Sequence, residues 1–288
     1  MTPTSSASSQ RDLVFAGITT VDLVLVAANL PAVGQKASTQ TSYLDVGGPA
    51  ANAADTASIL GAKVSLATDI GTGQLAGFAR DSLESYDVAV TEQPSDMSLP
   101  VSSIWVDAGS GERTILAADN AKARVGRISG LLVPVRAAAV LLDGHYAELA
   151  VTVARRARSA GVPVVLDCGR WRPAYGDLLP LATDVIACAT FRPPDLTGAA
   201  PEEALPAMRD RWGLELCAMT RGPDSILVAA SDGVEEVPVS TIDAVDTLGA
   251  GDVLHGAYVY YRYDAGLDGA EALARGAALA SESCLHLG

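Results

Sequence analysis

The chain has 288 residues, of which 49% are hydrophobic and 19% charged. This length suits one large domain with a sizeable core, and the composition is too apolar for a disordered chain. The net charge of −14 argues against broad binding to nucleic acid or anionic membranes, and no apolar stretch approaches the roughly 20 residues that span a bilayer.

The first residues and the cysteines indicate an intracellular globular protein. Residues 1–11 are rich in Ser and Thr and lack the apolar run of a signal peptide, so we expect a flexible tail. The cysteines lie far apart and form no C-x-x-C pair, so we expect buried thiols and no metal or redox site. The cysteines are Cys168, Cys188, Cys217 and Cys284. The simplest location is therefore a reducing cytoplasm.

Short apolar runs alternate with helical stripes along most of the chain. We expect strands at 13–18, 64–70, 138–142, 162–166, 185–190, 216–220 and 237–242. We expect helices at 50–60, 75–83, 147–160, 201–212 and 253–263. Strands separated by helices of this length indicate an α/β fold with a mostly parallel sheet covered on both faces.

Two segments break this alternation. Residues 23–46 and 100–118 contain strand-like runs without a helix between them, and the turn at 107–111 is typical of a hairpin. These extra strands predict a small second sheet, which could cover the ligand end of the core as a lid or form a dimer surface. No linker rich in Pro, Gly or Ser divides the chain, so we expect one domain over 12–288.

The segment Asp246–Asp252, with sequence DTLGAGD, carries the strongest chemical signal. It lies between a predicted strand and a predicted helix, where glycines let a ligand approach and helix N-terminal amides bind anions. A carboxylate beside an anion site is suited to take a proton from a hydroxyl that attacks a phosphate. The alternative is a tight turn with a capping Asp252.

The same residues resemble the C-terminal signature of the PfkB, or ribokinase-like, carbohydrate kinases. The segment 46–54 resembles the family's GG-x-x-x-N pattern, and 17–22 resembles its opening strand with a substrate-contacting Asp. Thr220–Gly222 resembles the T-x-G segment near the nucleotide. These matches keep the family's order over residues 12–288. The resemblance implies a three-layer ribokinase-like fold, with a small β-sheet lid, and a kinase that uses ATP and Mg²⁺.

The resemblance also implies roles for individual residues. Asp252 would be the base for the sugar hydroxyl, and the amides of Gly249, Ala250 and Gly251 would form the anion hole. Asp22, Gly48 and Asn52 would hold sugar hydroxyls. Thr220 and Gly222 would lie along the nucleotide, together with Gly249 and Gly251. Asp246 matches a position that in many relatives helps to bind a monovalent cation, so K⁺ is a candidate activator.

Three cationic or titratable residues are further candidates for substrate binding. Lys36 and Arg113 fall in the predicted lid, where they could meet an anionic or polyhydroxy substrate or merely face solvent. His145 follows a predicted strand at the edge where parallel sheets bind ligands. His255, three residues after Asp252, is expected to face a neighbouring helix or the core and is not assigned a catalytic role.

The sequence departs from the family at two places. Residues 189–192 read ATFR where many relatives have N-x-x-E, which puts the family's magnesium network in doubt. Residues 71–73 read GTG in place of an acidic G-D-D turn. The segments 46–54 and 252–257 look most like the ketohexokinase-like branch, which includes kinases for fructose derivatives such as 6-deoxy-6-sulfofructose. A sulfonate would need a cationic clamp, for which Lys36 and His145 are candidates.

Other functions are less well supported. The glycines at 71, 73 and 77 lack the spacing and the following acid of a dinucleotide-binding site, and no P-loop sequence occurs. A non-catalytic sugar or nucleotide sensor on the same fold is an alternative, motivated by residues 189–192. The expected partners are ATP and a small sugar, such as a ketose phosphorylated at a primary hydroxyl. Ribose, 2-keto-3-deoxygluconate and nucleosides stay open as substrates, as does a homodimer formed through the lid.

Overall fold

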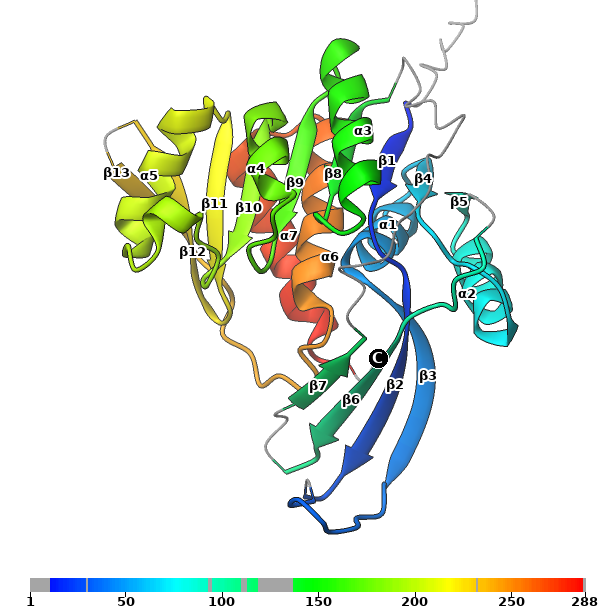
Figure 1. Cartoon of the computed structure of the whole chain (residues 1–288). Helices are drawn as coiled ribbons and strands as arrows, with labels where there is room; N and C mark the ends of the chain where they lie inside the picture. The colour runs from blue at the N-terminus through cyan, green and yellow to red at the C-terminus, as the bar shows by residue number, and fades with distance from the viewer. Residues whose placement is uncertain are drawn as a thin grey trace, which may run out of the picture.

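The computed structural model describes residues 11–29, 31–92, 95–109, 113–118, 137–231 and 233–286. Over these residues the chain forms a large β-sheet, a small β-sheet and helices that pack on the large sheet (Figure 1). Residues 1–10 of the expected tail and 110–111 of the expected hairpin turn lie outside the described residues.

The large sheet forms the body of the molecule. The described residues give it nine strands in the order β13-β12-β11-β10-β9-β8-β1-β4-β5. Neighbours from β11 to β5 are parallel, whereas β12 and β13 are added antiparallel at one edge. The strands are β1 Leu13–Ala16, β4 Val64–Ala67, β5 Val88–Thr91, β8 Ala139–Leu142, β9 Val164–Cys168, β10 Asp184–Cys188, β11 Leu216–Arg221, β12 Asp224–Ala230 and β13 Gly233–Val237.

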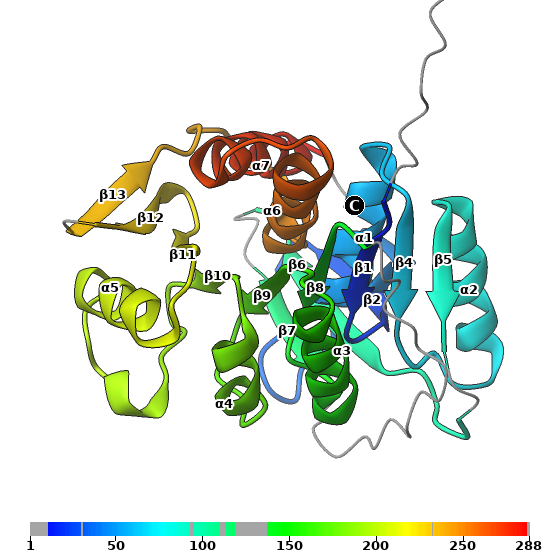
Figure 2. The ribbon, with the colours of Figure 1, turned by 90° about the horizontal axis from the view of Figure 1, so that it is seen from above.

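Helices cover both faces of this sheet and make it the middle of three layers (Figure 2). One face packs against α1 Pro49–Ile59, α2 Gln74–Ser85, α6 Ala250–Val259 and α7 Gly269–Ser283. The other face packs against α3 Ala147–Ser159, α4 Tyr175–Leu178 and α5 Pro201–Trp212. None of the helices in the described ranges is long and apolar enough to cross a membrane.

The strand β1 shows why the apolar runs are nearly continuous. Its residues alternate between the two cores: Leu13 and Phe15 pack into one, and Val14 and Ala16 into the other. All four are buried. A parallel sheet covered on both faces needs apolar residues at every position of a central strand, as the sequence predicts.

The small sheet extends from one end of the body and is called the lid sheet here (Figure 1). It has the order β3-β2-β6-β7, in which β2 and β6 are parallel and the outer pairs antiparallel. Its strands are β2 Thr20–Ala27, β3 Thr41–Gly47, β6 Val101–Asp107 and β7 Arg113–Ala117. The chain passes from β1 almost directly into β2, so Asp22 belongs to the lid sheet and not to the opening strand.

Several predicted boundaries are wrong for local reasons. The strand expected over 64–70 ends at Ala67, shortly before the Asp69 side chain accepts the amide of Gly71 and turns the chain. The strand expected over 237–242 is absent, because β13 ends at Val237 and the next residue is Pro238, which lacks an N–H for a sheet. The helix expected over 253–263 starts earlier, at Ala250, and becomes a π-helix over Tyr260–Asp264.

Candidate active site

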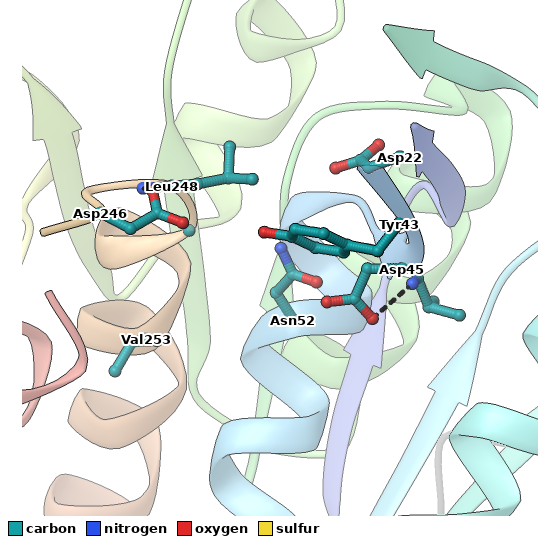
Figure 3. A pocket seen from close by; sticks show the side chains of 9 residues that line it. Asp22, Tyr43, Asp45, Asn52, Asp246, Leu248 and Val253 are labelled. Atoms are coloured by element: carbon teal, nitrogen blue, oxygen red, sulfur yellow. Dashed lines mark hydrogen bonds between the residues drawn. The ribbon is translucent and has the colours of Figure 1, made fainter. Parts of the chain in front are cut away.

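A cavity of about 150 Å³ lies between the lid sheet and the N-terminal ends of α1 and α6 (Figure 3). It is lined by Asp22, Tyr43, Asp45, Val46, Asn52, Asp246, Leu248, Gly249 and Val253. Of the residues selected from the sequence, Asp22, Asn52, Asp246 and Gly249 therefore meet at one place. The cavity is rich in carboxylates, which accept hydrogen bonds from hydroxyl groups.

Asp252 lies in the first turn of α6, beside this cavity. Its Oδ2 accepts a hydrogen bond from Asn52 Nδ2 at 2.7 Å, which joins α6 to α1. Burial, followed by the negative charge of Asp167, raises the pKa of Asp252 to about 7. The Asn52 hydrogen bond acts in the opposite direction. A carboxylate with a pKa near neutrality is suited to general base chemistry.

The N-terminus of α6 supplies amides beside Asp252. Gly249 is the residue before the helix and has φ of 71°, a left-handed conformation that favours glycine. The first amides of a helix have no intrahelical partner, and the helix dipole adds a partial positive charge there. Ala250 and Gly251 occupy this first turn, and Gly251 is exposed. The arrangement can therefore bind an anion next to a base.

Gly48 lets the N-terminus of α1 lie close to the backbone that follows β1. It precedes α1 with φ of 103°, and a Cβ there would lie 2.4 Å from the carbonyl oxygen of Ile18. The carboxylate of Asp143 accepts the amides of Ile18 at 2.9 Å and Ala50 at 3.3 Å. The strand β1, the strand β8 and the start of α1 are thereby fixed together, which places Asn52 opposite Asp252.

The lid sheet contributes an acidic wall with a phenol. Asp22 accepts a hydrogen bond from Thr20 Oγ1 at 2.9 Å, and burial raises its pKa. Tyr43 extends across the cavity with its hydroxyl toward Asp246 (Figure 3). That hydroxyl oxygen is buried and has no hydrogen-bond partner among the described residues. A polar group of this kind is available for a ligand.

Asp246 connects the lid sheet to the anion-binding turn. It is 8% exposed, and its Oδ1 accepts the amide of Leu248 at 2.8 Å. Arg113, the first residue of β7, places Nη1 3.9 Å from the same oxygen. Arg113 therefore faces a carboxylate of the cavity wall, and Asp246 already has a cationic neighbour.

The remaining predicted residues lie outside the cavity lining. Lys36 is exposed on the loop between β2 and β3. His145 Nε2 pairs with Arg172 Nη2 at 2.6 Å, and burial lowers the His145 pKa. Thr220 and Gly222 lie at the carboxyl end of β11 and in the turn after it. Neither Thr220 nor Gly222 lines the cavity.

Besides the apolar lining residues Val46, Leu248 and Val253, four polar residues in or near the site were not predicted from the sequence. Tyr43 and Asp45 line the cavity, whereas Leu44 between them is exposed. Because alternate residues of a strand share a face, a strand predicted over this segment would have placed Tyr43 and Asp45 on one side. Asp167 and Arg172 follow the predicted strand at 162–166 and lie at its carboxyl end. No local pattern distinguishes them from a polar loop, because their partners are distant in sequence.

Comparison with known proteins agrees with this geometry. The sequence matches the pfkB family carbohydrate kinase over residues 10–288. The chain belongs to the pfkB family of carbohydrate kinases. It is 26% identical to mouse (Mus musculus) ribokinase over 270 residues, 86% of this chain and 81% of that protein. Membership makes it an ATP-dependent sugar kinase.

Solved structures show the same fold. A candidate ribokinase from Agrobacterium tumefaciens has a TM-score of 0.86 at 25% identity, covering 97% of this kinase and 92% of that chain. Arabidopsis thaliana ribokinase, solved with ribose and ATP, has a TM-score of 0.76 at 20% identity, covering 97% and 94%. The expectation of a three-layer ribokinase-like fold is thus confirmed.

Kinases of this family use ATP with Mg²⁺, but the loop after β10 does not fit a resident ion. Ala189 and Arg192 occupy the positions where the resemblance places the Asn and Glu of the N-x-x-E pattern, and Arg192 Nε donates to the carbonyl of Ala199 at 2.9 Å. The described ranges contain no group of three or more His, Cys, Asp or Glu that could hold a metal. We therefore treat Mg²⁺ as part of the MgATP substrate, bound mainly by phosphates and water.

Proposed function

We propose that this kinase transfers the γ-phosphoryl group of MgATP to a hydroxyl of a neutral sugar, with Asp252 as the general base. The observation that carries the proposal is the position of the Asp252 carboxylate, beside the exposed first turn of α6 and the cavity. Asn52 donates a hydrogen bond to Oδ2, which fixes the carboxylate and leaves Oδ1 to accept the proton of a hydroxyl. One helix turn therefore supplies both the base and the anion-binding amides.

The proposed reaction balances as a single displacement. The sugar hydroxyl gives its proton to Asp252 as its oxygen forms a bond to the γ-phosphorus. The bond between that phosphorus and the β,γ-bridging oxygen breaks, and ADP leaves with its magnesium ion. The amides of Ala250 and Gly251 stabilise the negative charge on the transferring group.

The cavity favours an uncharged polyhydroxy sugar. Asp22, Asp45 and Asp246 face it, so an anionic sugar would meet repulsion at close range. Of the clamp expected for a sulfonate, Lys36 lies outside the lining and His145 is paired with Arg172. We therefore propose a pentose such as ribose or a ketohexose such as fructose, phosphorylated at a primary hydroxyl. Asp22 and Asn52 would bind other hydroxyls.

The test measures ADP release from MgATP with a panel of ribose, fructose, tagatose, sulfofructose, 2-keto-3-deoxygluconate and adenosine. We expect release with a neutral sugar, and we expect Asp252→Asn to lower kcat by about 10³-fold, as loss of a general base does. Asp81→Asn is the matched control, because Asp81 is exposed on α2. Near wild-type turnover by Asp252→Asn would refute the assignment of the base.

The nucleotide site, the domain and the dimer complete the proposed function. We propose that Thr220 and Gly222 lie along the nucleotide, that residues 12–288 form one domain, and that the lid sheet mediates a homodimer. We also propose a cytoplasmic location. The expectation of four buried thiols is wrong for Cys188, which is only partly buried, whereas Cys168, Cys217 and Cys284 are buried. Activation by K⁺ at Asp246 depends on Arg113, which already faces that carboxylate.

A further inference from the structure

His255 lies one turn after Asp252 in α6, and its ring nitrogens face hydrogen-bond acceptors. Nδ1 is 2.6 Å from the carbonyl oxygen of Gly251. Nε2 is 3.2 Å from the carbonyl oxygen of Ile186 and 3.5 Å from Oδ1 of Asp167. A neutral imidazole has one N–H and one lone pair, so one of its nitrogens would face an oxygen without a hydrogen. The doubly protonated ring satisfies both sides.

This ring lies in a buried group of charges below the anion-binding turn. His255 is 6% exposed, and its partner Asp167 is largely buried at the end of β9. The charge of Asp167 raises the pKa of Asp252, whereas His255 lowers it. His255 likewise opposes the rise that burial causes in the pKa of Asp167. The cation thus acts on two carboxylates at once.

The surrounding charges do not replace this cation. Asp143, at the end of β8, raises the pKa of both Asp167 and Asp252. His145 and Arg172 lower the pKa of Asp167, whereas the cation that lowers the pKa of Asp252 is His255. The group from α1 that faces Asp252 is the neutral amide of Asn52. Within the described residues, the positive charge that acts directly on Asp252 therefore comes from His255.

We propose that His255 is a positioning residue whose imidazolium joins the first turn of α6 to the ends of β9 and β10 and offsets the charge of Asp167. Asp252 is then a carboxylate when the sugar hydroxyl arrives. The inference rests on the proposed function, since Asp252 must be the base. His255 is buried and does not line the cavity, so its proposed role is to position Asp252 and not to act on the substrate.

The pH dependence of kcat/KM tests this role through two opposite changes. His255→Gln keeps a hydrogen-bond donor but removes the charge. We expect it to shift the midpoint of the acid limb of the kcat/KM profile to higher pH by about one unit. Asp167→Asn removes a negative charge, and we expect it to shift the same midpoint to lower pH. His286→Gln, at an exposed histidine, is the matched control and should leave the profile unchanged. Shifts in the same direction, or none, would overturn the proposal.

A measurement on the wild-type kinase covers the case in which a variant fails to fold. The chain has three histidines, so the nitrogen-15 signals of the His255 ring can be assigned. At pH 7.5 we expect hydrogen on both ring nitrogens, and a ring with one hydrogen would refute the proposal. An inactive Asp252→Asn together with unshifted His255→Gln and Asp167→Asn profiles would refute this inference alone. An active Asp252→Asn would refute the proposed base itself.

Discussion

At the residue scale, the features that suit Asp252 to catalysis also act against folding. Burial and the charge of Asp167 raise its pKa to about 7, whereas in the unfolded chain it has the ordinary value near 3.8. Between these values the unfolded chain gives up the proton and the folded kinase retains it. Ionisation of Asp252 therefore lowers the free energy of unfolding as the pH rises from about 4 to about 7.

Replacing Asp252 by Asn should accordingly stabilise the kinase at high pH. The amide carries no charge, and its oxygen can still accept the Asn52 hydrogen bond. We expect Tm to increase by several degrees at pH 8 and to approach that of the wild type only below about pH 3, where the Asp252 carboxyl is largely protonated in both the folded and the unfolded chain. Thermal unfolding across this range checks the difference, with Asp81→Asn as control. A stabilisation that is largest at low pH would contradict the assigned pKa.

At the element scale, the lid strand β7 and the start of α6 are connected through one carboxylate. Arg113 opens β7 and faces Asp246, whose Oδ1 also holds the amide of Leu248. Leu248 directly precedes Gly249, the residue before α6. The position of the lid sheet is thereby linked to the turn whose amides are proposed to bind the phosphoryl group. We propose that the charge of Arg113 acts on Asp246 in place of the monovalent cation that the family resemblance implies there.

Arg113→Gln should expose this link and create a dependence on K⁺. In choline chloride we expect kcat/KM for the sugar to fall about fivefold, corresponding to ~1 kcal/mol of lost ion pairing. Replacing choline by KCl at the same concentration should restore the variant more than it stimulates the wild type. Arg155→Gln, at an exposed arginine of α3, is the control. Equal K⁺ responses in the wild type and the variant would contradict the idea that the charge of Arg113 takes the role of a K⁺ ion at Asp246.

At the scale of the whole molecule, the sequence predicts elements better than the contacts between them. The buried strands and the helix at 201–212 follow from local periodicity, because each buries a continuous face. The bond from Asn52 to Asp252 spans 200 positions, so the sequence located both residues by resemblance and not by their proximity. The contact between Asp167 and His255 could not be predicted from any local pattern in the sequence, because it forms only when β9, β10 and α6 pack together.

The lid sheet has one face in the cavity and one face that is apolar and exposed. Register places Leu44, Leu23, Ser103 and Leu116 in one cross-strand row on the face opposite Asp22 and Asp45. Trp105 lies on the same face, two residues along β6 from Ser103. Leu44 is 47% exposed and Leu116 76%. An apolar patch of this kind on a sheet is typical of an interface, and we expect it to pair with the same face of a second copy.

Leu116→Glu tests the lid-mediated homodimer. A buried carboxylate in each partner would repel its counterpart, so we expect the mass in solution to change from that of a dimer to 29.5 kDa. Light scattering after gel filtration measures the mass at several protein concentrations. Ile59→Glu is the matched control, because Ile59 is 68% exposed at the end of α1, away from the lid sheet. A wild-type monomer would contradict this interface, and so would dissociation by both variants. If the dimer forms through the exposed face of the lid sheet, Leu116→Glu should dissociate it and Ile59→Glu should not.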